Sequence, residues 1–171
     1  MNKHEQVQSK TVLEYMVMIN EQSYSGIGRQ LQITPQQFSD WIKKRRPIPQ
    51  ERLQALADYF GVDGAIFVDN SNFAKPMTPL GKIELHILLV EQKVAQLVEE
   101  RADEEDIEPY REKKQKLLKE KADQHRLERI AAALQQNDER IDWIFDIVLA
   151  ELDAGQVEEL EMKLEMGRNR P

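Results

Sequence analysis

The sequence predicts an all-α fold, with a bundle of short helices in its first part and long helices in its second. Charged residues make up 32% of the 171 residues and aromatic residues only 6%, with 7 glycines and 7 prolines, a composition more typical of helices than of sheets. Apolar residues also recur at intervals of three and four, which is the period of one helix face.

The first two expected helices precede a tight turn. Apolar residues at helical spacing predict a helix over residues 11–21. A serine, either Ser23 or Ser25, can cap a second short helix. Residues 32–34 then form the turn.

The next two helices have clear start and stop signals. Thr34 can cap a third helix with Pro35 in its first turn, where the missing proline N–H costs nothing. The Pro-Ile-Pro sequence at 47–49 stops this helix. A fourth helix is expected over 50–60, with Gly61 at a C-cap position, and one further turn follows it.

A polar stretch that ends in two prolines separates two unlike halves of the chain. Residues 71–79 are interpreted as a linker between a domain over 1–70 and a helical region over 80–171. Residues 1–70 contain eight basic and eight acidic residues, whereas 71–171 contain 16 basic and 23 acidic ones. The second half therefore accounts for the whole net charge of −7.

Long helices are expected after the linker. Six apolar residues alternate spacings of three and four, the pattern of a coiled-coil seam that would join two chains. They are Leu80, Ile83, Ile87, Val90, Val94 and Leu97. Pro109 is expected to break the helix or to start a new one. A second series of this spacing runs over 127–148, and a short last helix is expected over 156–166.

Two features of this half leave alternatives. Asn137 is either a buried polar residue that sets the register or the cap of a fresh helix, and we favour a break there. The acidic run 99–108 and the basic run 111–121 favour a hairpin that folds near Pro109 and sets the two runs side by side. Each exposed ion pair would contribute only about 0.2–1 kcal/mol. The alternative is that each run is a solvated helix face.

Composition also argues against several classes of protein. The absence of cysteine excludes disulfide scaffolds, thiol catalysis and cysteine-ligated zinc. The three histidines are scattered, and three aspartates on one helix face, at 138, 142 and 146, fit a solvated surface better than a cation site. Residues 1–10 do not resemble a secretory signal, and no apolar run of about 18 residues could span a membrane. We expect a soluble, cytoplasmic protein that is not an enzyme and needs no cofactor.

The most informative stretch is residues 23–62, SYSGIGRQLQITPQQFSDWIKKRRPIPQERLQALADYFGV. It is similar to the lambda-repressor-like (XRE-type) helix-turn-helix family, which includes phage repressors and many bacterial regulators, and the resemblance covers about residues 8–68. The matching positions are 27–31, Ile33, 38–41 and the closing helix 53–62. There are two departures: Gly28 stands where alanine is commoner, and Gln32 replaces the glycine of the turn.

The resemblance implies an N-terminal bundle whose third helix reads base edges in the major groove of double-stranded DNA. The residues that would face base edges are Gln36, Gln37, Asp40 and Lys44. Those that would contact phosphates are Tyr24, Ser25, Lys43, Arg45, Arg46 and Gln50. A glutamine such as Gln36 can bind adenine with two hydrogen bonds, and Asp40 could accept one from cytosine.

These expectations combine into a sequence-specific transcriptional regulator, most simply a repressor, that acts as a homodimer or higher homo-oligomer on paired half-sites. The C-terminal helices would hold the oligomer together and could receive a protein effector. One alternative is a DNA-binding adaptor of plasmid or phage replication or partition. The other is a helical protein-interaction scaffold that does not use DNA at all.

Overall fold

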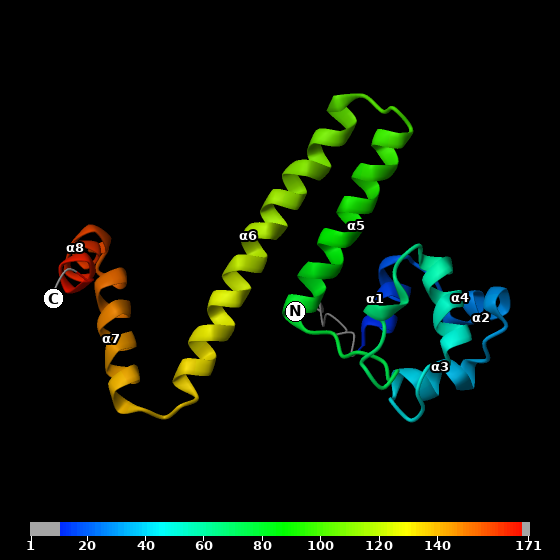
Figure 1. Ribbon diagram of the computed structural model, residues 1–171, viewed down its shortest axis with the longest axis horizontal. Coiled ribbons are helices and arrows are strands. Elements are labelled where there is room, and N and C mark those ends of the chain that lie inside the picture. The colour runs from blue at the N-terminus through cyan, green and yellow to red at the C-terminus, as the bar shows by residue number, and fades with distance from the viewer. Residues whose placement is uncertain (1–10, 169–171) are drawn as a thin grey trace, which may run out of the picture. The chain divides into compact units, whose positions relative to one another are not determined.

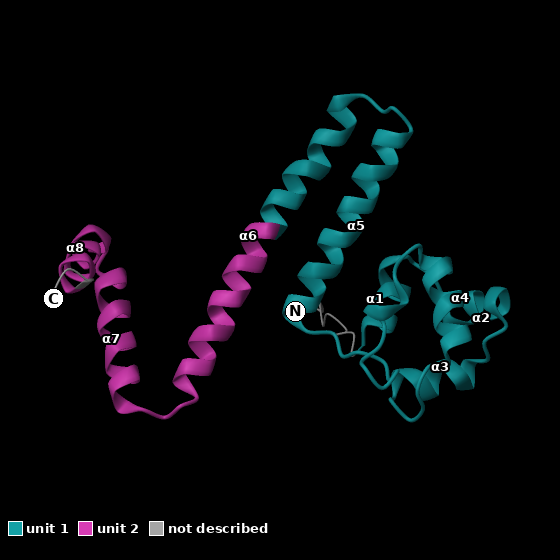
Figure 2. Ribbon diagram, viewed as in Figure 1, with its two compact units in different colours: residues 1–117 teal, residues 118–171 magenta. Residues whose placement is uncertain are grey.

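The computed structural model describes residues 11–168, and all of its regular elements are helices (Figure 1). Within these residues the extended pairing is limited to two isolated bridges, Thr11 with Pro76 and Val68 with Ala74. The predicted all-α class is therefore confirmed. The chain forms two compact units that divide between Leu117 and Leu118, inside one helix (Figure 2). Residues 1–10 and 169–171, which belong to the predicted domains, lie outside the described part.

Four short helices and a 3-10 turn, η1, form the N-terminal domain, which we define as residues 11–78. They are α1 (Val12–Ile19), α2 (Tyr24–Leu31), α3 (Pro35–Ile42), α4 (Gln50–Phe60) and η1 (Gly64–Ile66). The expected helices and caps agree with this order. Of the two candidate serines, Ser23 is the cap of α2, because its hydroxyl accepts a hydrogen bond from the Gly26 N–H. Gly61 ends α4 in the left-handed conformation, at φ 66°.

The short helices close on one apolar core. Leu13, Ile27 and Leu56 are fully covered, at 0% exposure. The Phe38 ring of α3 meets the Trp41 ring edge-on, with 5.7 Å between centroids. The helices therefore pack on one another through their apolar stripes, which is how such short segments become stable in water.

The predicted linker, 71–79, packs against the N-terminal domain. Ala74 is completely buried, the Lys75 N–H donates to the Phe67 carbonyl at 2.8 Å, and the Lys75 carbonyl accepts from the Val12 N–H at 3.0 Å. The Asn72 carbonyl accepts from the Ile48 N–H at 2.7 Å. This segment is therefore an integral edge of the domain rather than a spacer.

Helix α5 (Pro79–Glu99) also packs on this domain. Leu85 belongs to the same core, the Tyr15 hydroxyl lies 2.7 Å from His86 Nε2, and Gln92 donates to the Gly61 carbonyl at 2.7 Å. The boundary between the two compact units therefore lies much later in the chain than the predicted linker.

Helix α6 (Glu104–Leu134) starts earlier than expected, and Pro109 lies inside it. The chain reverses direction over residues 100–103, where Arg101 takes a positive φ of 57°. The expectation of a break at Pro109 was wrong: the helix continues through the proline, although Pro109 has no N–H to donate to the Glu105 carbonyl. Buried Ile107 anchors the turns around it.

Helices α5 and α6 form a hairpin in which Ile83, Ile87 and Val90 pack against Leu117. The expected pairing of an acidic arm with a basic arm was wrong. Because the turn precedes the acidic residues 104–108, they share α6 with the basic residues, and Arg111 forms ion pairs with Glu104 and Glu108 of its own helix. An ion pair that does join the two helices links Lys114 to Glu91, at 2.9 Å.

The C-terminal unit, residues 118–168, contains the end of α6 and two further helices, α7 (Glu139–Asp153) and α8 (Val157–Arg168). Asn137 has a positive φ of 52°, so the expected break is confirmed. The residue that caps α7 is Asp138 rather than Asn137, because its carboxylate accepts from the Arg140 N–H at 3.0 Å. Of residues 118–167, none is buried.

Candidate nucleic-acid interface

Helices α2 and α3 meet at a close-packed turn. The Ile33 N–H donates to the Gly28 carbonyl at 2.8 Å, and a Cβ atom on Gly28 would overlap the Ile33 carbonyl oxygen. This glycine is therefore needed where the turn returns against α2, as expected for two helices that approach closely.

Gln32 takes the conformation that the turn demands although it is not a glycine. It lies in the left-handed region, at φ 53° and ψ 41°. A residue with a side chain pays about 1–2 kcal/mol to adopt this conformation. The turn keeps a backbone suited to glycine, and the strain is concentrated at this residue.

The first turn of α3 is held by reciprocal caps. The Thr34 hydroxyl accepts from the Gln37 N–H at 3.2 Å, and the Gln37 side-chain oxygen accepts from the Thr34 N–H at 2.8 Å. Gln37 was expected to face base edges, and its side-chain oxygen is engaged in this cap at the start of α3. The signal was present in the sequence, because threonine followed three residues later by glutamine is a capping box.

Asp40 is the centre of a polar network on the outer side of α3. Its carboxylate accepts from the exposed Gln36 amide at 2.9 Å and lies 3.7 Å from Arg45 Nη1 and 3.8 Å from Arg46 Nε. Its side chain is only 14% exposed. Gln36 and Asp40, both expected to read bases, are therefore coupled to each other and to the cations behind them.

Four consecutive exposed cations follow the end of α3, which are Lys43, Lys44, Arg45 and Arg46. Lys43 is the C-cap residue, and Lys44 has a positive φ of 54°. The Arg45 N–H donates to the Asp40 carbonyl at 2.8 Å. Lys44 thus lies past the helix in a tight turn, beside the residues expected to bind phosphates.

Tyr24 and Ser25 lie in the first turn of α2. The Tyr24 ring packs against Phe38, with 5.3 Å between centroids. Burial, and to a smaller extent the Glu14 carboxylate, raises the pKa of Tyr24 to about 12, so its hydroxyl keeps its proton near neutral pH. Ser25 is exposed, with its hydroxyl 3.2 Å from that of Ser23.

Gln50 is the exposed first residue of α4. The preceding residue, Pro49, provides no side-chain cap for the helix. The first N–H groups of α4 are therefore not capped by that side chain, and such groups favour anions.

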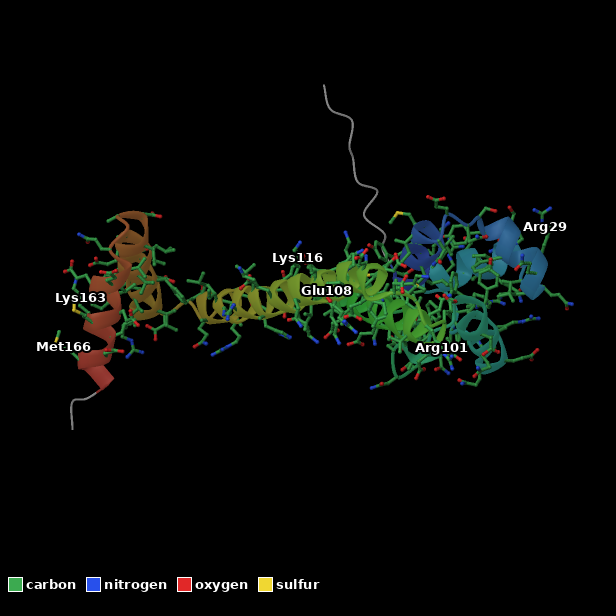
Figure 3. All side chains as sticks on the ribbon, turned by 90° about the horizontal axis from the view of Figure 1, so that it is seen from above. Arg29, Arg101, Glu108, Lys116, Lys163 and Met166 are labelled. Atoms are coloured by element: carbon green, nitrogen blue, oxygen red, sulfur yellow. The ribbon has the colours of Figure 1, made fainter. Side chains whose placement is uncertain are left out.

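Sequence reasoning missed two arginines of this domain. Arg52 of α4 donates to the Leu31 carbonyl at 2.8 Å and ties α4 to the end of α2. Arg29 is exposed in the last turn of α2 and extends away from the domain (Figure 3). Neither arginine has a local sequence signal, because its contacts and its direction depend on how the helices pack.

The structure divides the predicted dimer seam into two sets. Ile83, Ile87 and Val90 are buried against the chain's own α6. The other three are partly buried: Val94 borders a hollow with Lys114 of α6, and Leu80 borders another near Val12. Three of the six residues are thus covered within one chain. The use of the seam between chains remains a prediction.

Comparisons of the chain with protein-family models, with curated proteins and with solved structures found no match. Across residues 11–168, acidic residues and histidines do not gather in any group of three that could hold a metal ion. No helix in the same part has the length and apolar character needed to cross a lipid bilayer.

Proposed function

We propose that the chain is a sequence-specific DNA-binding transcriptional regulator that places α3 in the major groove. The observation that carries the proposal is the polar face of α3, where exposed Gln36 donates to the largely covered Asp40 carboxylate, followed at once by four exposed cations. A helix with hydrogen-bonding side chains at its start can read base edges, and adjacent cations position it on phosphates.

The charges of the N-terminal domain fit this use. Residues 1–70 are neutral overall, yet half of their eight basic residues stand together at 43–46. If a dimer neutralises about 4–8 phosphates, log K should fall against log salt with a slope of roughly −4 to −7. A slope near zero would remove phosphate contacts as the basis of affinity.

The first experiment is selection of bound fragments from random double-stranded DNA, followed by mobility shift on the selected site. We expect one preferred sequence arranged as paired half-sites, because so small a domain contacts few base pairs. Recovery of unrelated sequences with no common element would contradict specific recognition. It would instead favour the scaffold alternative.

Substitutions then separate base reading from phosphate binding. Gln36→Ala should change which bases are preferred, with a loss of about 1–3 kcal/mol for each specific contact. Asp40→Asn should also change the preference, and it releases Arg45 and Arg46 from the carboxylate. Lys44→Ala and Arg46→Ala should weaken all sequences alike.

The matched control is Arg101→Asn, which removes an exposed cation from the turn between α5 and α6 (Figure 3). We expect it to leave affinity and base preference unchanged. If the Gln36 variant keeps the parent's preference, α3 is not the reading helix. A change in transcription from the chain's own promoter would separate a regulator from a replication or partition adaptor.

A further inference from the structure

The C-terminal unit exposes an unusual amount of apolar side chain. Thirteen large apolar residues between 118 and 168 are at least 40% exposed, including Trp143 at 64%, Leu149 at 54% and Met166 at 68%. Isolated exposed apolar residues are ordinary on protein surfaces, but a contiguous set usually marks an interface.

Helix α7 is apolar around most of its circumference. At 3.6 residues per turn, four of its acidic residues fall on one narrow stripe, and apolar side chains occupy most of the remaining surface. The stripe contains Glu139, Asp142, Asp146 and Asp153. A helix of this kind is stable only when it is covered on more than one side.

Helix α8 covers only one side of α7. The two are joined by an ion pair between Lys163 and Glu151, at 2.9 Å. Ile144 and Ile147 remain 52% and 40% exposed. The side of α7 that carries these two isoleucines therefore needs another partner.

The exposed area is close to what a dimer buries. A half-exposed side chain of this size presents roughly 30–60 Å² of apolar surface. Thirteen such residues therefore offer roughly 400–800 Å² per chain, against about 800 Å² for each partner of a standard protein interface.

The charges of these helices favour a second copy of the chain as the partner. Residues 111–129 of α6 contain eight basic and four acidic residues, whereas residues 139–168 of α7 and α8 contain nine acidic and three basic ones. In a two-fold dimer each pairing of patches occurs twice. Two copies can thus set each basic stretch beside the partner's acidic stretch.

We infer that a second copy of this chain covers the apolar surface of the C-terminal unit, in a two-fold arrangement that pairs α6 of one copy with α7 and α8 of the other. This extends the proposed function by locating the contact between chains in the C-terminal unit rather than in the α5 seam. It does not depend on DNA, because it follows from residues 118–168 and the charges of α6 alone.

The test is sedimentation of the full chain without DNA across a concentration series, for the parent and for Ile144→Glu with Ile147→Glu. We expect a concentration-dependent dimer for the parent and a dissociation constant raised at least tenfold for the variant. The Trp143 side chain should become less accessible to the quencher acrylamide as the parent associates. Trp41, at 3% exposure, should stay shielded throughout.

The matched control is Met18→Glu with Val98→Glu. These apolar residues are 48% and 54% exposed, but lie outside the C-terminal unit. The control should associate like the parent. A parent that sediments as a monomer at all concentrations would overturn the inference, as would equal weakening by the two double variants.

A charge-exchange test remains decisive if the isoleucine variant unfolds. One variant carries Lys119→Glu and Arg126→Glu, and the other carries Glu161→Lys and Glu165→Lys. Each alone should dimerise at least tenfold more weakly than the parent, and an equimolar mixture should regain the dimer because opposite charges again face each other. A mixture no tighter than its components would reject the pairing of α6 with α7 and α8.

The two proposals fail in different ways. If the C-terminal unit does not associate, the N-terminal domain should still shift a single half-site, although weakly. If the DNA proposal is wrong, the parent should still dimerise without DNA. Sedimentation and mobility shift therefore report on them separately.

Discussion

The N-terminal domain and the C-terminal unit carry similar shares of large apolar side chains but bury them very differently. Val, Ile, Leu, Met, Phe, Tyr and Trp account for 25 of the 68 residues in 11–78 and for 17 of the 51 in 118–168. In the first region Leu13, Ile27 and Leu56 are 0% exposed, whereas in the second Trp143 and Leu149 are more than half exposed.

The difference shows that apolar content alone does not make a core. In the N-terminal domain, α1, α2 and α3 are each eight residues long and are separated by short turns, so each stripe soon meets another. In the C-terminal unit α7 has 15 residues, and only the 12-residue α8 follows it. Too few helices are present there to enclose one another, because burial needs a covering element on each apolar side.

The largest effect should come from the same substitution made in both regions. Leu56→Ala removes a fully buried side chain and should lower the free energy of unfolding by about 2–5 kcal/mol. Leu149→Ala removes a half-exposed one and should change it by less than about 0.5 kcal/mol at low protein concentration. Urea unfolding monitored by Trp41 fluorescence measures the effect of Leu56→Ala. Urea unfolding monitored by circular dichroism, which reports helix content, measures the effects of both substitutions. Similar losses at the two positions would mean that the C-terminal unit has a core of its own.

A pair of glycines should give effects of opposite sign. Gly28→Ala places a methyl group against the Ile33 carbonyl oxygen and should destabilise the N-terminal domain by about 1–3 kcal/mol. At Gly167 of α8 an added Cβ would meet nothing within 4 Å, so Gly167→Ala should favour the helix by up to about 1 kcal/mol. Thermal unfolding of the two variants checks both signs. A Gly28→Ala variant as stable as the parent would show that the turn can shift away from α2.

Two of the residues in left-handed turns, Gln32 and Asn137, should respond unequally to glycine. Gln32→Gly relieves the strain at the turn between α2 and α3 and should stabilise the domain by about 0.5–1 kcal/mol. Asn137→Gly, in the turn between α6 and α7, should gain less because asparagine tolerates this conformation. Chemical denaturation of both variants compares them. A loss of stability in Gln32→Gly would indicate that the glutamine side chain has a role beyond the turn.

At alkaline pH the N-terminal domain should lose a small amount of stability. The pKa of Tyr24 is about 12 in the folded protein, above the ordinary tyrosine value of 10.0. Between these values the unfolded chain releases the proton and the folded one keeps it, so stability falls as pH rises through this window. Tyr24→Phe should lose less stability than the parent from pH 9.5 to 11.5, measured as the difference between the two denaturation midpoints. Residues 118–168 contain no tyrosine, so they make no such contribution. Parallel curves for parent and variant would contradict the assignment.

Helix ends were predictable where a single residue determines them. Thr34 with Pro35 starts α3, and Gly61 ends α4, because caps and prolines act within one turn. The prediction of a helix boundary at Pro109 failed for the opposite reason. The start of α6 depends on the turn at Arg101 and on the burial of Ile107, which are tertiary features.

The candidate site was predictable as a set of surface positions but not as a network. Helical spacing places Gln36 and Asp40 on one outer face, yet it cannot show that Arg45 and Arg46 turn back toward the Asp40 carboxylate. The seam shows the same limit. A three–four spacing indicates that Ile83 and Ile87 are covered, but not whether α6 of the same chain or a second chain covers them.

The reciprocal caps of Thr34 and Gln37, with Pro35 between them, have a consequence for the entropy of any complex made by α3. A helix end that frays in the free protein must lose backbone freedom when it binds, at about 1–2 kcal/mol for each residue that becomes ordered. Here that freedom is lost when the domain folds. A ligand of the first turn therefore meets a rigid surface, and its binding enthalpy is not offset by ordering of the helix.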